Sequence, residues 1–139
     1  MAFAIHELNH VALHVADLER SMRFYEEVME LPKLNRPAFG FPGAWYALGT
    51  QELHLIADDS LTENSRRHHH YALLVDDIYA AKADLESKGV TVFDGPGLRP
   101  DGPTQLFFHD PDGYRIEVYH APEGFVPAGM IERENDPAL

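Results

Sequence analysis

The chain has 139 residues, of which 45% are hydrophobic, so it can form one compact domain with a core but not two large ones. Its formal net charge of −12 disfavours binding to nucleic acid or to anionic membranes, because both are themselves negatively charged. The absence of cysteine excludes disulfides and thiolate metal sites, so a metal would be held by imidazole and carboxylate groups.

The first expected strand covers residues 8–15 and shows the two-residue alternation of a half-buried strand. Its valines and its second leucine point to one face, whereas His10 and His14 point to the other. Asp17 follows as a candidate N-cap, and apolar residues at helical spacing then predict a helix that ends before Pro32. One face of this helix is expected to cover the apolar side of the strand.

A β-hairpin is expected later in the first half, after a Pro- and Gly-rich loop over residues 35–43. Its two strands, AWYALG and QELHLIA, meet at a Gly-Thr pair that begins with Gly49. In the second of these strands Glu52 and His54 share one face. The polar segment 58–67 then forms the expected boundary between two halves.

The second half repeats the order of the first. We expect a strand over 70–76, a helix from Ile78 to Lys88 that Asp77 caps and Gly89 closes, a short strand over 90–94, and strands over 104–109 and 114–120. The Gly- and Pro-rich stretch 95–103 is expected to form a loop, and residues 110–113 a turn.

Each half therefore reads β-α-β-β-β, which predicts an α+β fold. We expect a single domain over residues 1–139, with a first module at 5–60, a second module at 67–121 and a C-terminal tail at 122–139. The two tandem modules are expected to form a curved, half-barrel mixed sheet with the helices on its convex side.

Neither a secretory signal nor a membrane span is predicted. The first ten residues lack the basic start and the long apolar run of a secretory signal. No window approaches the roughly 20 apolar residues that a membrane span needs. We therefore expect a cytoplasmic protein without nucleic-acid or membrane partners; a small-molecule substrate is implied only by the resemblance described below.

The duplication also repeats candidate metal ligands. Residues His10, Ala12, Leu13, Val15 and Asp17 recur sixty positions later as His70, Ala72, Leu73, Val75 and Asp77. The last strands of the halves correspond as well, with His54 matching Glu117 at an offset of sixty-three. We expect His10, His54, His70 and Glu117 to project from the same concave side. Three imidazoles and one carboxylate suit Zn²⁺, Ni²⁺, Fe²⁺, Co²⁺ or Mn²⁺ and disfavour Ca²⁺ and Mg²⁺.

The duplicated plan resembles the vicinal oxygen chelate superfamily, which includes glyoxalase I, extradiol dioxygenases and bleomycin-binding proteins. The segments that carry the resemblance are LNHVALHVADLERSMRFYEEVMEL, HHHYALLVDD and FFHDPDGYRIEV, and together they cover about residues 5 to 121. Among these groups the chain is most similar to glyoxalase I-like proteins, which share its GAW, LHLI and QLFFHDPDG stretches.

This resemblance implies roles for the candidate ligands. His10, His70 and Glu117 lie where the superfamily has its recurring metal triad, and His54 lies where glyoxalase I has a carboxylate ligand. His54 is therefore expected either as a fourth ligand or as a base beside the metal, and Glu52 would replace it if the register were shifted. The resemblance implies one divalent transition metal per site. It does not decide between Zn, Ni, Fe, Co and Mn.

The resemblance also implies a reaction class. A glyoxalase-like lyase or isomerase would act on a small substrate with vicinal oxygens through a metal-stabilised enediolate, and Glu117 or His54 would carry the proton between carbons. One alternative is an extradiol-type dioxygenase, which would need only His10, His70 and Glu117 on Fe²⁺. A non-catalytic, bleomycin-type binding protein is another. Relatives often pair, so a homodimer with a shared site is expected.

Two positions differ from the glyoxalase I pattern and concern glutathione. His14 stands where glyoxalase I offers an arginine to the glutathione carboxylate, and Asp58 stands where it offers an asparagine. An anionic tripeptide gains little from Asp58, so the use of glutathione stays open. His14, on the front face of the first strand, and Trp45, beside the Pro- and Gly-rich loop, are further candidates for the substrate pocket.

Overall fold

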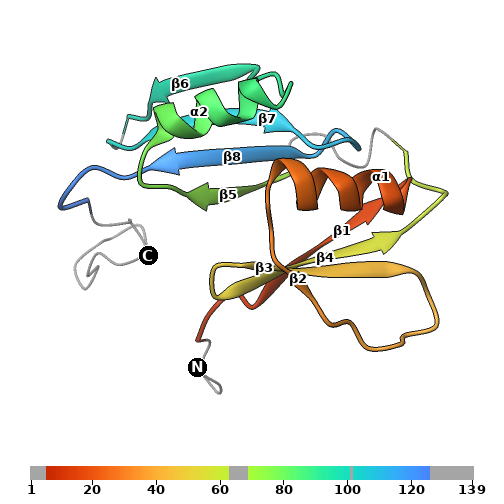
Figure 1. Ribbon diagram of the computed structural model, residues 1–139. Helices are drawn as coiled ribbons and strands as arrows, with labels where there is room; N and C mark the ends of the chain where they lie inside the picture. Colours follow the sequence, from red (N-terminus) through yellow and green to blue (C-terminus); the bar gives the residue numbers. More distant parts are fainter. Residues whose placement is uncertain (1–5, 63–68, 101, 126–139) are drawn as a thin grey trace.

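The computed structural model describes residues 6–62, 69–100 and 102–125. The first half contains β1 (His10–Val15), α1 (Leu18–Arg23), η1 (Phe24–Val28), β2 (Lys33–Leu34), β3 (Gly43–Leu48) and β4 (Gln51–Ala57), and the second contains β5 (His70–Leu74), α2 (Ile78–Ser87), β6 (Asp94–Leu98), β7 (Thr104–His109) and β8 (Arg115–His120) (Figure 1). The predicted α+β class and the duplicated β-α-β-β-β plan are confirmed.

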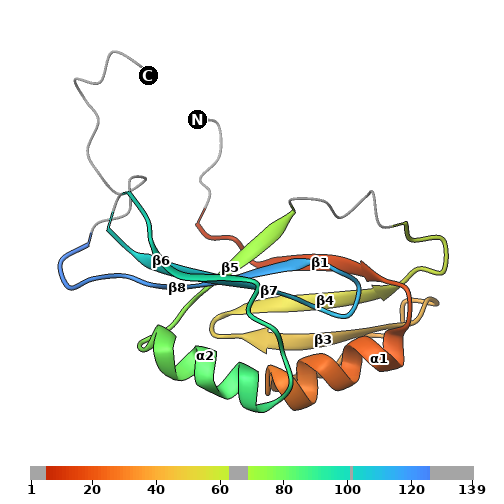
Figure 2. The same cartoon turned by 90° about the horizontal axis from the view of Figure 1, so that it is seen from above.

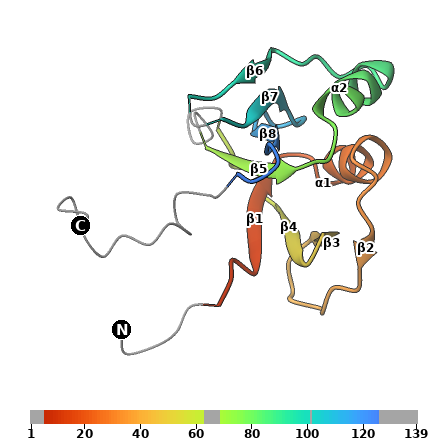
Figure 3. The same ribbon diagram turned by 90° about the vertical axis from the view of Figure 1, so that its left-hand side faces the viewer.

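The two halves form separate four-stranded sheets with the same topology. Their strand orders are β1-β4-β3-β2 and β5-β8-β7-β6, and in each the first and last strands of the half pair in parallel. The sheets are open, with β1 and β5 at equivalent edges. Both helices lie along one side of the strands (Figure 2), and α1 lies directly below α2 when the first half is below the second (Figure 3).

Both helices begin at the aspartates that the sequence predicts. The Asp17 carboxylate accepts a hydrogen bond from the backbone of the first turn of α1, and Asp77 accepts two from the first turn of α2. Gly89, with φ +80°, follows α2 as predicted. The first helix differs in one respect, because residues 24–28 form a π-helical turn that the apolar spacing does not indicate.

One predicted strand is wrong. Residues 90–93 lie outside any strand, and β6 instead occupies residues 94–98, within the Gly- and Pro-rich stretch predicted as a loop. Gly95 explains the shift, because a Cβ there would lie 2.3 Å from the carbonyl oxygen of Gln105, so only glycine fits against β7. Proline is tolerated in β6 because this strand is at the edge of its sheet.

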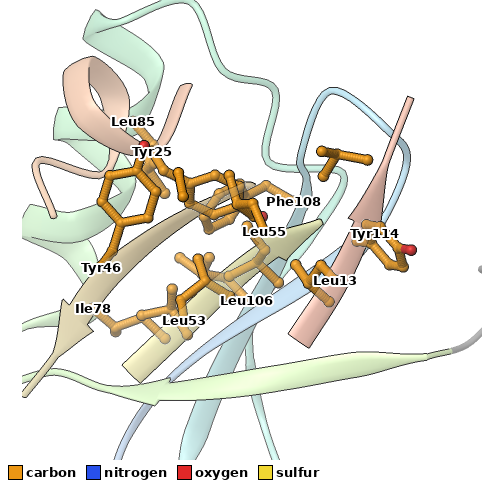
Figure 4. Close-up of a cluster of buried hydrophobic side chains, with 14 residues drawn as sticks. Leu13, Tyr25, Tyr46, Leu53, Leu55, Ile78, Leu85, Leu106, Phe108 and Tyr114 are labelled. Atoms are coloured by element: carbon orange, nitrogen blue, oxygen red, sulfur yellow. The ribbon is translucent and has the colours of Figure 1, made fainter. Parts of the chain in front are cut away.

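One hydrophobic cluster joins the two halves (Figure 4). Its buried members include Leu13, Tyr25, Tyr46, Leu53 and Leu55 from the first half and Ile78, Leu85, Leu106, Phe108 and Ile116 from the second. The predicted alternation of β1 is confirmed, because Leu13 and Val15 are buried whereas His10 and His14 are exposed. The module bounds and the tail at 122–139 stay predictions, and residues 126–139 lie outside the described residues.

A buried polar contact also ties the halves together. Asp112, in the turn between β7 and β8, accepts hydrogen bonds from Ala16 N at 3.0 Å, from Ser21 Oγ at 3.1 Å and from Arg20 Nη2 at 3.1 Å. The chain positions that meet here are more than ninety residues apart. The turn predicted at residues 110–113 does not indicate this contact, by which Asp112 also holds the start of α1.

The neighbouring Asp110 combines both roles. Its Oδ1 accepts the backbone N–H groups of Asp112 and Tyr114, which closes the turn as the sequence predicts. Its Oδ2 accepts the Tyr25 hydroxyl at 2.7 Å, across the interface between the halves. Burial raises the pKa of the Asp110 carboxyl, and burial likewise raises the pKa of Tyr25.

Across the described ranges, no helix is both long and apolar enough to cross a membrane.

Candidate metal centre

His10 and His54 form the first pair of candidate ligands. Parallel pairing of β1 with β4 places His10 opposite Glu52 and Ala12 opposite His54. The side chains of His10 and His54 therefore leave the same face of the sheet, as predicted. Their rings are stacked, with centroids 4.2 Å apart and planes 16° apart.

His54 is held on two sides by neighbouring side chains. Its Nε2 lies 2.8 Å from Glu52 Oε1, and the Trp45 ring is stacked on it with centroids 4.1 Å apart. Trp45 is the cross-strand partner of His54 on β3, which accounts for the contact. Glu52 thus contacts the candidate ligand His54, and a carboxylate in this position fixes the orientation of an imidazole.

His70 and Glu117 form the second pair. Their strands pair in parallel, with Ala72 opposite Glu117, so the pair repeats the arrangement of the first half. His70 Nε2 lies 3.8 Å from Glu117 Oε2. The Glu117 residue is only 7% exposed, which makes its carboxylate one of the few buried charges among the described residues.

The four candidate ligands thus form two separate pairs, His10 with His54 and His70 with Glu117. Within the described part of one chain, no three His, Asp or Glu side chains are close enough to hold a metal ion. The donor types fit a transition metal, since imidazole and carboxylate are its usual ligands. Nitrogen lone pairs lie in the ring plane, so the near-parallel rings of His10 and His54 must open before both nitrogens can face one ion.

A hollow between the two halves reaches one member of each pair. It has a volume of about 970 Å³ and is lined by residues of both halves, including His10 and Glu52 from the first and His70 from the second, whereas His54 and Glu117 are not part of its lining. Much of its remaining lining is apolar, with Tyr71 and Leu73 of β5 among the contributors. This combination of an apolar wall and a few polar groups is typical of small-molecule sites.

His14 and Asp58, the two residues that differ from the glyoxalase I pattern, contact each other. Its Nδ1 lies 2.7 Å from Asp58 Oδ2, and Asp58 Oδ1 accepts the Ser60 hydroxyl at 2.6 Å. The Ser60 hydroxyl and then His14 lower the pKa of Asp58 to about 2, so its carboxylate is charged at neutral pH. Together with Tyr114, these residues line a shallow hollow of about 380 Å³.

The sequence analysis does not predict the contact of His14 with Asp58 or that of Glu52 with His54. The sequence does carry a signal for the first of these contacts. The parallel register that brings Ala57 beside Val15 also brings Asp58 close to His14, and this register follows from the matched first and last strands. The contact between Glu52 and His54 has no comparable signal, because residues two apart on a strand share a face without necessarily bonding.

Comparison with known proteins gives the family. The model of the glyoxalase/bleomycin resistance protein/dioxygenase superfamily matches residues 7–118. The chain belongs to this superfamily. This superfamily member is 32% identical to the lactoylglutathione lyase of Haemophilus influenzae, over 80% of its own length and 90% of the relative. It is also 32% identical to the lactoylglutathione lyase of Neisseria meningitidis serogroup A, over 84% and 92% of the two chains.

Solved structures agree on the fold of this superfamily member. A glyoxalase/dioxygenase from Nostoc punctiforme superposes with a TM-score of 0.70 at 25% identity, covering 84% of this chain and 92% of that one. A glyoxalase/bleomycin resistance protein/dioxygenase from Nocardioides superposes with a TM-score of 0.73 at 21% identity, over 90% and 89% of the two chains. The latter likeness concerns the fold alone.

Proposed function

We propose that this protein is a metal-dependent, glyoxalase-like lyase or isomerase that acts on a small substrate with vicinal oxygens. The observation that carries the proposal is the duplicated ligand pair, His10 with His54 and His70 with Glu117, on equivalent strands of the two halves. The named activity of the relatives, lactoylglutathione lyase, supports the same reaction class.

The proposed site is shared between two copies of the chain. Within the described residues one chain supplies two pairs but no group of three. The proposed ligand set therefore combines His10 and His54 of one protomer with His70 and Glu117 of another. The first ligand of each pair lies on an open sheet edge, β1 or β5, where a second copy can approach. A two-fold dimer would contain two equivalent sites.

The side chains of the site have distinct proposed roles. A bound divalent metal supplies stabilisation for the negative charge that develops on the vicinal oxygens of the substrate. Glu117 is proposed to take a proton from one carbon and return it to the next, because its carboxylate is nearly buried and lies beside His70. Glu52 is proposed to orient His54 for binding the metal or for sharing the proton transfer.

The proposed substrate does not contain glutathione. The anion of glutathione would meet His14 and Asp58, which are already bonded to each other, and Asp58 carries its own negative charge. A charged carboxylate beside an anionic ligand is unfavourable. The proposed substrate is therefore a small molecule without the tripeptide, and the cytoplasmic location predicted from the sequence is kept as part of the proposal.

Mixed dimers test the shared site directly. We would load the untagged protein, His10→Ala, His70→Ala and an unfolded and refolded mixture of the two variants with Zn²⁺, and measure bound zinc after gel filtration. About one equivalent per chain is expected for the native protein and almost none for either variant alone. Each mixed dimer should regain one intact site, because the intact His10 of one chain meets the intact His70 of the other.

The alternatives give different results in the same experiment. A site within one chain would leave the mixture as empty as the single variants. A protein that binds neither Zn²⁺, Ni²⁺, Fe²⁺, Co²⁺ nor Mn²⁺ would exclude the metalloenzyme and leave the non-catalytic binding protein. A strict preference for Fe²⁺, with His54→Ala retaining the metal, would favour the dioxygenase.

A further inference from the structure

Each half places an aromatic ring opposite its second candidate ligand. In the first half Trp45 is the cross-strand partner of His54, and in the second half Phe107 is the cross-strand partner of Glu117. Trp45 is stacked on His54, and the Phe107 ring meets His70 edge to face with centroids 6.3 Å apart. The duplication therefore gives the proposed site two aromatic walls, one from each module.

Arg115 lies on the same face, beside the second ligand pair. It is two residues before Glu117 on β8, and it is the register partner of His70 on one side and of His109 on the other. Its guanidinium is 5.6 Å from the centre of the Phe93 ring, which holds it by a cation–π contact. The Phe93 ring in turn lies beside the Phe107 wall, with centroids 6.2 Å apart.

Arg115 has no ion pair with a carboxylate among the described residues, and Glu117 faces His70 instead. A guanidinium beside a ligand pair and a ring is suited to bind a carboxylate through two parallel hydrogen bonds.

The corresponding position in the first half differs. Two residues before His54 lies Glu52, whose carboxylate is already bonded to the His54 ring. The proposed site therefore has aromatic walls on both modules, but the position two residues before the second ligand is Arg115 in one module and Glu52 in the other. Such asymmetry fixes the direction in which an asymmetric ligand lies.

We propose that Arg115, Trp45 and Phe107 form a subsite for an aromatic carboxylate, with the ring of the ligand between the two aromatic walls and its carboxylate on Arg115. This inference rests on the proposed function, because only the proposed shared site would bring Trp45 of one chain and Phe107 of another beside the same metal. It narrows the substrate class to small aromatic anions that carry vicinal oxygens. A small aliphatic substrate would leave the walls uncovered.

Three matched probes separate the ring from the charge. 3-Phenyllactate has both groups, lactate lacks the ring, and 3-phenylpropane-1,2-diol has the ring and two vicinal oxygens without the carboxylate. Binding to the Zn²⁺-loaded protein is followed by tryptophan fluorescence, because Trp45 is the only tryptophan of the chain. Phenyllactate is expected to bind about tenfold more tightly than either of the other probes.

Two charge-removing variants complete the test. Arg115→Gln should lose most of the native preference for phenyllactate over the diol and keep only the part that the contact of the carboxylate with the metal supplies, while Arg115→Lys should keep more of the preference. Arg23→Gln is the matched control, because Arg23 is an exposed residue of α1 and loses the same charge. Zinc binding by each variant, read from the same fluorescence signal, shows that the ligand pairs are intact.

The outcomes separate the two proposals. Failure of the native protein to bind zinc overturns the proposed function, and the subsite with it. Zinc binding without a preference for phenyllactate overturns the subsite and leaves the proposed function standing. Equal losses in Arg115→Gln and Arg23→Gln would mean that only the net charge matters, which also overturns the assignment of Arg115.

Discussion

Replacing Asp112 with alanine should destabilise the protein strongly. The side chain is nearly buried and accepts three hydrogen bonds, two of which come from the Ala16 N–H and the Ser21 hydroxyl. Ser21 is fully buried, so its hydroxyl would lose its partner without gaining water. A hydrogen bond to a charged group contributes about 1.5–3 kcal/mol. The Arg20 side chain is 42% exposed, so its ion pair adds about 1 kcal/mol or less.

These contributions predict a loss of about 3–5 kcal/mol in the free energy of unfolding. For a chain of this length that corresponds to a fall in Tm of roughly 10–15 °C. Urea unfolding followed by circular dichroism measures the free energy, and Asp59→Ala, at an exposed position in the turn after β4, is the matched control. A loss below about 1 kcal/mol, or one equal to that of the control, would show that the contact between the halves contributes little.

Two further perturbations concern the candidate site. Asp58 has a folded-state pKa of about 2, below its ordinary value, so its stabilising effect is complete above about pH 4 and is lost as the pH falls toward 2. Asp58→Asn should therefore lower Tm at pH 7 and have a much smaller effect at pH 2, and an equal effect at both pH values would contradict the stabilising hydrogen bonds of Asp58 with Ser60 and His14. Glu52→Gln should weaken zinc binding about tenfold or more by loosening His54, measured by competition with a chelator. Unchanged affinity would mean that His54 needs no orienting partner.

The local features of the fold could be predicted because they depend on neighbouring residues. The alternation of β1 follows from a period of two, and the start of each helix follows from the oxygen of an aspartate side chain. The pairing of His10 with His54 could be predicted as well, since a repeated strand order brings the first and last strands of each half together.

Other features could not be predicted, because they depend on contacts that leave no local pattern. The position of β6 is decided by the close approach of Gly95 to β7, whereas the apolar residues before it resemble a strand more closely. The contact of Asp112 with α1 joins positions more than ninety residues apart. The π-helical turn at residues 24–28 likewise has no signature in the apolar spacing.

The separation of the ligands into pairs follows from duplication itself. A β-α-β-β-β module fixes the register between its own first and last strands, so each module can align two ligands by backbone pairing alone. Nothing in that register fixes the distance between His10 and His70, which lie on different sheets at open edges. In the proposed dimer the contact between chains supplies this distance. Metal binding should then depend on protein concentration, and the isolated chain should hold zinc weakly even with all four ligands present.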